Sequence, residues 1–225
     1  MRCVSWSRRA ARRANEPHMT RLWIKICGLR TREAVEAASD AGADAVGFVF
    51  HAGSPRNLAI DEARALQSAV PSRVERVAVF MHPSQQLVDE VVAAIQPDWV
   101  QTDLEDFAVL SLPREQGALP VLRSGQTLRE PLPERCLLES ARSGMGEPAD
   151  WREAARVAKA TQVVLAGGLD EHNVGEAVRT VRPFGVDVSS GVESSRGVKD
   201  VARIREFIRA ARAAETGRMS EENRR

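Results

Sequence analysis

A cysteine stands where a strand-like apolar run meets a turn. Cys27 closes the run 23–27, "WIKIC", and Gly28 follows it. A free thiol has a pKa of about 8.5, so a small thiolate fraction near neutral pH can remove a proton from a substrate. In a strand, Lys25 faces the same way as Cys27. Its ammonium could lower the thiol pKa or pair with a carboxylate, and a lone buried cysteine could equally be inert packing.

Two glycine-rich segments have the composition of an anion-binding site. They are "LAGGL" (165–169) and "VDVSSGVESSRGVKD" (186–200), each at the end of an apolar run. Glycines let backbone N–H groups approach an anion, serine hydroxyls can donate hydrogen bonds, and a helix N-terminus favours negative charge. Either segment alone is compatible with an ordinary tight turn. Together they predict a phosphate site formed by Gly167, Gly168, Ser189, Ser190 and Gly191.

The composition narrows the classes of partner. The chain has 225 residues and a net charge of +1, which gives no reason to expect a nucleic acid or a membrane surface as partner. No apolar run reaches the roughly 18 residues that a membrane span requires. The three cysteines and four histidines form no metal-ligand pattern. We therefore predict a cytoplasmic protein without a metal.

The two ends of the chain differ from its middle. Residues 1–20 are rich in arginine, and Met19 stands almost directly before the first strand. We interpret this segment as a disordered extension or a mis-assigned start, with a basic nucleic-acid-binding arm as the alternative. Residues 214–225 are predicted to be a polar tail. One domain is expected over residues 21–213.

Short apolar runs alternate with amphipathic stretches along this domain. Strands are predicted over 23–27, 45–50, 74–80, 98–101, 119–123, 135–139, 162–166 and 185–188, and they are continuously apolar, as in a parallel sheet buried on both faces. Helices are predicted over 31–41, 61–69, 84–95, 151–160, 171–180 and 199–213. The stretches 103–111 and 126–134 are weaker, because the first is short and the second carries two prolines.

This order of elements predicts an α/β protein, a single-domain (β/α)8 TIM barrel with weak or shortened helices after strands four and five. An open doubly wound sheet is the competing architecture, but its GxGxxG motif is missing after the first strand. In a barrel the carboxyl ends of the strands form one mouth, where reactive groups lie. Cys27 and Asp187 would then face a common cavity beside both glycine-rich loops.

Several motifs resemble the phosphoribosylanthranilate isomerase family. The similar segments are "KICGLR", "GFVF" followed by "SPR", "VAVF", "LAGGL" and "GVDVSSGVE…GVKD", in the family's order between residues 22 and 210. The resemblance implies a cofactor-independent Amadori rearrangement of N-(5-phosphoribosyl)anthranilate to 1-(2-carboxyphenylamino)-1-deoxyribulose 5-phosphate, a step of tryptophan biosynthesis. The partner is then a small phosphorylated substrate, and the protein is expected to be a monomer or a homodimer.

The resemblance also implies roles for individual residues. Cys27 corresponds to the general base, and Arg56, in "SPR", to the residue that binds the anthranilate carboxylate with its planar fork. Asp187 matches the family's "DVSSG" and would share the proton transfers or orient neighbouring donors. Gln101 is retained from the family's "QLHG", and we expect it, like Lys25, to contribute to substrate binding.

The sequence departs from the family at two strand ends. Glu139 stands where the family has an aspartate as general acid, and a displacement near 1 Å can cost about 100-fold in rate. Asp103 and Leu104 replace the His-Gly of "QLHG". Asp103 either caps the next helix, which we favour, or adds negative charge to the mouth. These departures leave two alternatives: a phosphosugar isomerase or epimerase with another substrate, and a noncatalytic binder of a phosphorylated ligand.

Overall fold

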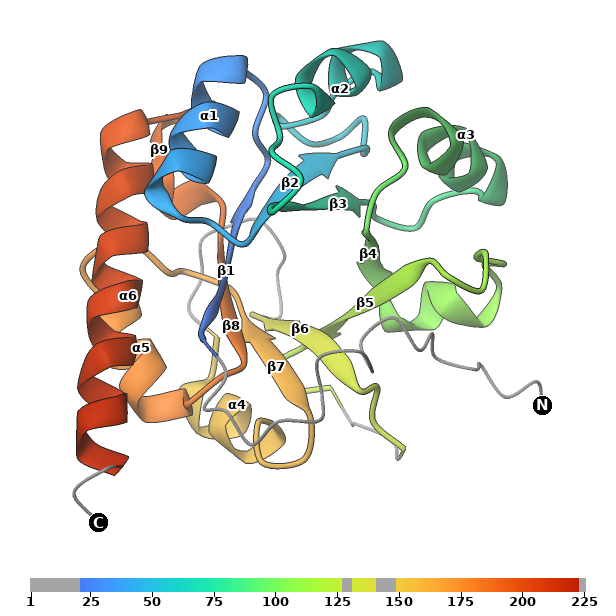
Figure 1. Cartoon of the computed structure of the whole chain (residues 1–225). Helices are drawn as coiled ribbons and strands as arrows, with labels where there is room; N and C mark the ends of the chain where they lie inside the picture. Colours follow the sequence, from blue (N-terminus) through green and yellow to red (C-terminus); the bar gives the residue numbers. More distant parts are fainter. Residues whose placement is uncertain (1–20, 127–130, 141–148, 223–225) are drawn as a thin grey trace.

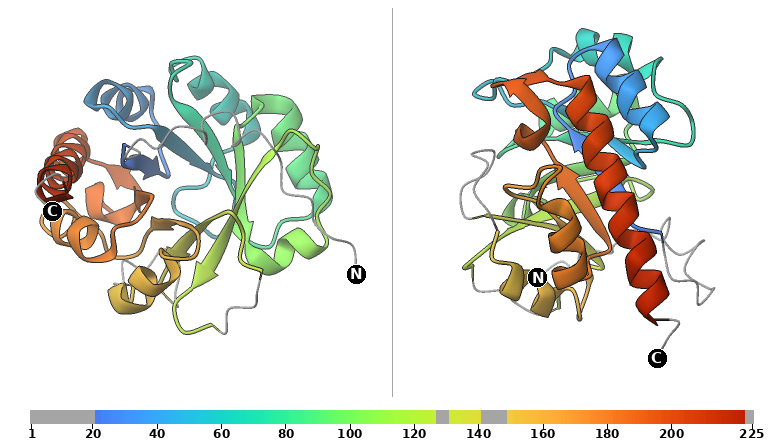
Figure 2. Two further views of the ribbon diagram at one scale, coloured as in Figure 1. Left: turned by 60° about the horizontal axis from the view of Figure 1, so that its bottom comes forward. Right: turned by 90° about the vertical axis from the view of Figure 1, so that its left-hand side faces the viewer.

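Parallel strands form a closed ring, and helices surround it (Figure 1; Figure 2). The computed structural model describes residues 21–126, 131–140 and 149–222. The strands are β1 (Trp23–Cys27), β2 (Ala45–Val49), β3 (Glu75–Val79), β4 (Trp99–Asp103), β5 (Gly117–Arg123), β6 (Arg135–Glu139), β7 (Gln162–Leu165) and β8 (Gly185–Val188). Each strand pairs with the next in sequence, and β1 also pairs with β8, which closes the ring. The predicted barrel is confirmed.

Helices follow most of the strands. They are α1 (Arg32–Ala41), α2 (Ile60–Gln67), α3 (Gln85–Ile95), α4 (Trp151–Val157), α5 (Val174–Val181) and α6 (Val201–Glu222). Two short 3-10 helices, η2 (Leu104–Ala108) and η3 (Ser190–Val192), follow β4 and β8. A small antiparallel hairpin of β9 (Glu193–Ser195) and β10 (Val198–Lys199) comes after η3.

The structure differs from the prediction at three places. Strand β4 extends to Asp103 rather than ending at residue 101, which places Asp103 in the barrel wall. No helix is formed by the described residues between β5 and β6, where Pro131 and Pro133 supply no N–H donor. Helix α6 continues to Glu222, so most of the segment predicted as a polar tail is helical. The predicted extension 1–20 lies outside the described residues.

Helix α1 shows how local sequence sets an element. Thr31 is extended, and its hydroxyl accepts a hydrogen bond from the backbone N–H of Ala34 at 3.2 Å, which caps the helix. Gly42 ends the helix in the left-handed conformation, with φ of 96°. The chain then turns directly into β2, which pairs with β1.

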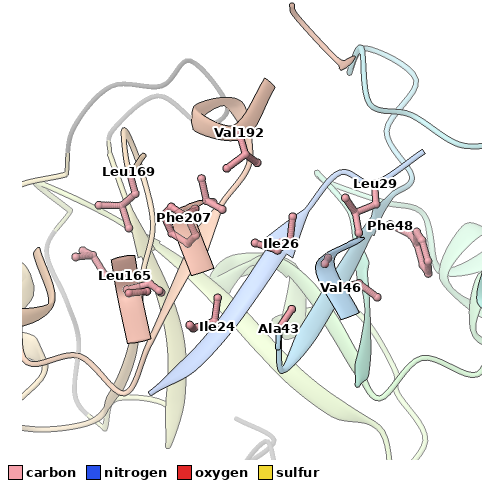
Figure 3. Packing of buried hydrophobic residues seen from close by; sticks show 14 of the residues in the cluster. Ile24, Ile26, Leu29, Ala43, Val46, Phe48, Leu165, Leu169, Val192 and Phe207 are labelled. Atoms are coloured by element: carbon pink, nitrogen blue, oxygen red, sulfur yellow. The ribbon is translucent and has the colours of Figure 1, made fainter. Parts of the chain in front are cut away.

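The outward faces of the strands pack against the surrounding helices. In β1, Ile24 and Ile26 belong to a large apolar cluster that also contains Val46, Leu165 and Phe207 (Figure 3). Phe207 comes from α6, the long helix that runs beside α1 and α5 on one flank of the barrel (Figure 1). None of the described helices has both the length and the apolar character needed to span a lipid bilayer.

The inward faces at the amino ends of the strands form a polar and aromatic floor. Trp23 and Trp99 both donate their indole N–H to the Glu75 carboxylate, at 3.0 and 2.9 Å. The guanidinium of Arg135 lies 4.7 Å from the Trp99 ring centroid and 4.1 Å from that of Phe184. Burial lowers the pKa of Arg135, against the opposing effect of Glu75. These contacts close the end of the barrel opposite the mouth.

We predict that Glu75→Ala lowers the free energy of unfolding by about 2–4 kcal/mol, because it leaves two indole donors without their acceptor. Urea unfolding followed by tryptophan fluorescence and circular dichroism measures the change. Glu90→Ala, at an exposed position of α3, is the control and should change stability little. Equal stabilities for the two variants would contradict this role of the floor.

Candidate active site

A cavity of about 230 Å³ opens at the carboxyl ends of the strands. It is lined by nearly all the residues predicted for the site, namely Cys27, Arg56, Gln101, Glu139, Gly167, Gly168, Asp187, Ser189 and Ser190. The predicted residues that do not line it are Lys25 and Gly191. The ring of strands therefore brings together residues that are up to 163 positions apart in the sequence, from Cys27 to Ser190.

Lys25 is fully buried beneath the cavity and pairs with Asp187. Its ammonium donates a hydrogen bond to Asp187 Oδ1 at 2.7 Å. Burial alone would lower the pKa of Lys25, but Asp187 and Cys27 outweigh it and raise the pKa, so the ammonium stays charged. Lys25 contacts Asp187 and does not line the cavity, and its contribution to substrate binding stays a prediction.

The Cys27 thiol lies in a strongly desolvated place. Burial raises the pKa of Cys27 and Asp187 adds to this, while the ammonium groups of Lys25 and Lys199 oppose it. The lowering effect expected from Lys25 is present, but burial exceeds it. Gly47 on β2 leaves room for these groups, because an added Cβ would lie 3.1 Å from both Cys27 Sγ and Lys25 Cε.

Arg56 reaches the cavity by passing over Gly28. A Cβ on Gly28 would lie 2.6 Å from Arg56 Cδ, and Gly28 has φ of +75°, so the glycine after Cys27 is needed on both counts. The Arg56 guanidinium is buried and makes a bidentate pair with Glu193, from Nε to Oε1 at 2.6 Å and from Nη2 to Oε2 at 3.0 Å. Its other N–H groups have no hydrogen-bond partner among the described residues, and Arg56 lines the cavity, so these groups can meet a ligand there.

Arg123 joins the two strand ends at which the sequence departs from the family pattern. Its Nη1 donates to Glu139 Oε1 at 2.7 Å, and its Nη2 donates to Asp103 Oδ1. The favoured capping role of Asp103 was wrong, because its side chain makes no capping hydrogen bond to η2. Asp103 lies two residues after Gln101 in β4, so both side chains face the barrel interior.

The two glycine-rich loops meet at one edge of the cavity. The backbone N–H groups of Gly167, Gly168, Ser189 and Ser190 have no hydrogen-bond acceptor among the described residues. Gly167 and Gly168 have φ of +89° and +64°, values that L side chains disfavour. Gly191 lets the loops touch, since a Cβ there would overlap the Leu169 carbonyl oxygen, 2.0 Å away. This arrangement is suited to an anion such as phosphate.

One group of potential metal ligands lies at the rim. Ligand atoms of His82, Asp103 and Asp106 lie within 4.8 Å of one another. Protein contacts account for all three: Asp103 pairs with Arg123, and Asp106 accepts a hydrogen bond from Thr102 and contacts His82 Nδ1 at 3.0 Å. This contact to Asp106 raises the pKa of His82.

Sequence reasoning missed Arg123, Glu193 and Lys199. Period-two alternation could have found Arg123, because Leu119 and Val121 of the same strand face the barrel interior and Arg123 continues that series. Glu193 and Lys199 lie within the glycine-rich segment 186–200, where they contact each other, but Glu193 also pairs with Arg56, far away in the sequence. No local pattern identifies this contact with Arg56.

A closed parallel barrel whose mouth carries a buried thiol, carboxylates and two adjacent glycine-rich loops has the architecture of a (β/α)8-barrel enzyme. Residues 24–210 match the family model described as N-(5'phosphoribosyl)anthranilate (PRA) isomerase. The chain belongs to this family.

Relatives that bear this name align along almost their whole length. An N-(5'-phosphoribosyl)anthranilate isomerase of Rhodopseudomonas palustris is 41% identical over 210 residues, which cover 85% of this chain and 98% of that protein. A phosphoribosyl anthranilate isomerase crystallised with reduced 1-(o-carboxyphenylamino)-1-deoxyribulose 5-phosphate is 31% identical, with a TM-score of 0.71 over 86% of this chain and all of that one. The enzyme from Thermus thermophilus is 28% identical, with a TM-score of 0.74 over 85% of this chain and 99% of that one.

We predict that the Cys27 thiol titrates above the ordinary value of about 8.5 and that Lys25→Met raises its midpoint further, because the nearest cation is lost while Asp187 stays. The measurement is thiolate absorbance at 240 nm against pH, with the curve of Cys27→Ser subtracted to remove the other cysteines. Lys159→Met, at an exposed position, is the control for charge alone. An unchanged or lower midpoint in Lys25→Met would show that the ammonium does not act on the thiol.

Proposed function

We propose that this protein is a phosphoribosylanthranilate isomerase of tryptophan biosynthesis. It converts N-(5-phosphoribosyl)anthranilate into 1-(2-carboxyphenylamino)-1-deoxyribulose 5-phosphate without a cofactor. The observation that carries the proposal is one cavity with Cys27 and Glu139 in its wall and the anion-binding loops at its edge. Family membership and the length of the alignments support it.

The substrate's two anionic ends have separate places in this cavity. The phosphate binds the backbone N–H groups of the loops after β7 and β8. The anthranilate carboxylate binds the free edge of Arg56, in the loop after β2. Gln101 has a buried Oε1 with no hydrogen-bond partner among the described residues, and it lines the same cavity. That acceptor suits a hydroxyl or an N–H of the substrate between the two anions.

The chemistry consists of proton transfers. Glu139 protonates the ring oxygen, and the C1–O bond of the furanose breaks to give an iminium. Cys27, as the thiolate, then removes the proton from C2, and the electron pair of that C–H bond forms the enolamine. Tautomerisation of the enolamine gives the ketone. Asp187 accepts a hydrogen bond from Lys25 and orients this ammonium toward the developing thiolate.

Glu139 can serve as an acid although it contacts a guanidinium. The Arg123 guanidinium that contacts Glu139 is also paired with Asp103. Asp103 balances the charge of Arg123, so less of it acts on Glu139. Asp103 and Glu139 therefore work as a set, and the mouth is adjusted to the longer acid.

A monomer or homodimer in the cytoplasm remains our expectation. One solved structure of the enzyme from Thermotoga maritima concerns monomers generated from a dimeric isomerase. Analytical ultracentrifugation would determine whether the present protein is a monomer or a dimer.

We predict that the purified protein accelerates the loss of phosphoribosylanthranilate fluorescence and that Cys27→Ala lowers kcat/KM by about 10²- to 10⁴-fold, because the general base is removed. Cys136→Ala is the matched control. Cys136 is buried on the outer face of β6, away from the cavity, so this variant should stay close to the wild type. A wild-type rate no faster than the uncatalysed decay would reject the proposed reaction in favour of another phosphosugar or a noncatalytic role.

We also predict that Glu139→Asp lowers kcat by about 10- to 100-fold, since the shorter side chain withdraws its carboxyl from Arg123 and from the substrate. Glu139→Gln should lose more, because the amide cannot deliver the proton. Steady-state rates of both variants over a range of pH decide the matter. A Glu139→Asp enzyme faster than the wild type would mean that the glutamate is a handicap and that the mouth has not adjusted to it.

A further inference from the structure

Glu193 connects the two parts of the cavity that are proposed to hold anions. It begins β9, directly after η3 and the serine loop that follows β8. Its carboxylate reaches Arg56, which comes from the loop after β2. The residue does not line the cavity itself, and neither the family resemblance nor the proposed mechanism gives it a role.

The carboxylate of Glu193 is buried and surrounded by donors. Oε1 accepts from Arg56 Nε at 2.6 Å and from Lys199 Nζ at 2.8 Å. Oε2 accepts from Arg56 Nη2 at 3.0 Å and from the backbone N–H of Gly197 at 3.0 Å. Burial favours the protonated acid, but the hydrogen bonds from Arg56 and Lys199 outweigh it and lower the pKa of Glu193 to about 2. The Glu193 carboxylate is therefore ionised near neutral pH.

The contact with Arg56 determines which edge of the guanidinium meets a ligand. Glu193 occupies Nε and one N–H of Nη2, which leaves the other donors of the fork for the cavity. The Arg56 stem is confined on its other side by Gly28. The fork is thus held in place before a ligand arrives, which lowers the entropy cost of binding a carboxylate.

The contact with Lys199 acts on the opposite anion site. Lys199 Nζ also donates to the Ser189 carbonyl at 2.8 Å and lies 3.3 Å from its hydroxyl. Ser189 lines the cavity and belongs to the anion-binding loop, whereas the Lys199 side chain is only 3% exposed. Glu193 therefore fixes Lys199, and Lys199 fixes the backbone around Ser189.

We propose that Glu193 is a positioning residue with two effects. It orients the Arg56 guanidinium toward the substrate carboxylate, and through Lys199 it holds the phosphate-binding loop around Ser189 in place. One buried anion between two cations would then control the affinity for both ends of the substrate. The inference rests on the proposed function for the identity of the two ends. It is tested by direct binding, which does not require turnover.

The experiment measures calorimetric binding of anthranilate and, separately, of inorganic phosphate to full-length variants. In Glu193→Gln we expect both dissociation constants to rise by about tenfold or more, because the amide turns N–H groups toward donors and leaves two cations without their shared partner. Arg56→Lys should weaken anthranilate alone, and Lys199→Met should weaken phosphate alone. Ser195→Ala, on the exposed face of the same hairpin, is the matched control and should change neither constant.

Steady-state kinetics separates positioning from a general loss of structure. Positioning predicts that KM rises by about tenfold or more in Glu193→Gln with a much smaller change in kcat, since groups remote from the reacting carbons are affected. If Glu193→Gln does not fold, Glu193→Asp is used, whose shorter carboxylate cannot span both cations and should weaken both probes.

Weakening of one probe only, or tighter anthranilate binding after release of Arg56, would overturn the inference. So would a wild-type protein that binds neither probe. A wild-type protein that binds both probes but shows no isomerisation would instead reject the proposed function. The positioning role of Glu193 would then still be tested by the binding data for its variants.

Discussion

Alternation of side chains along the strands of a closed ring is the constraint on which the site depends. Each strand sends every second residue into the barrel, so the residue type at each inward position decides what the mouth, the middle and the floor contain. In β1 the inward series is Trp23, Lys25 and Cys27, and it runs from the aromatic floor to the reactive thiol. Pairing of β1 with β8 then places Asp187 beside Lys25, with 2.7 Å between Lys25 Nζ and Asp187 Oδ1. A shift of either strand by one residue would turn these groups outward into the apolar layer.

Much of this arrangement could be predicted from the sequence because it depends on local patterns. The apolar runs, their carboxyl ends and the glycines of the two loops are visible along the chain, and the barrel places them at one mouth. The orientation of Asp103 was missed because the predicted strand ended two residues early, and an aspartate before a helix is typical of a cap. Its partner Arg123 comes from the next strand, and that pairing depends on the register of β4 against β5.

Two groups of three charges lie around the mouth, and in each of them one ion is shared by two partners of opposite sign. Arg123 lies between two carboxylates, and Glu193 lies between two cations. Taking a charge out of water is costly unless partners satisfy it, and a shared ion satisfies two partners at once. Such groups also hold distant loops to one another, since the members of each come from different strands or loops. The sequence lists the charges, but only the fold shows how they are shared.

The floor has a consequence for how molecules pass through the barrel. Trp23, Trp99, Phe184 and Arg135 fill the end of the barrel opposite the mouth with aromatic rings and a stacked guanidinium, so a ligand enters and leaves at the mouth and does not pass through this floor. Water that an arriving ligand displaces has to leave through the mouth, by which the ligand enters. The outgoing product uses this route as well, and the next molecule cannot enter from behind to push it out. Substrate and product therefore use the same opening, and the product has to leave before the next substrate molecule can bind.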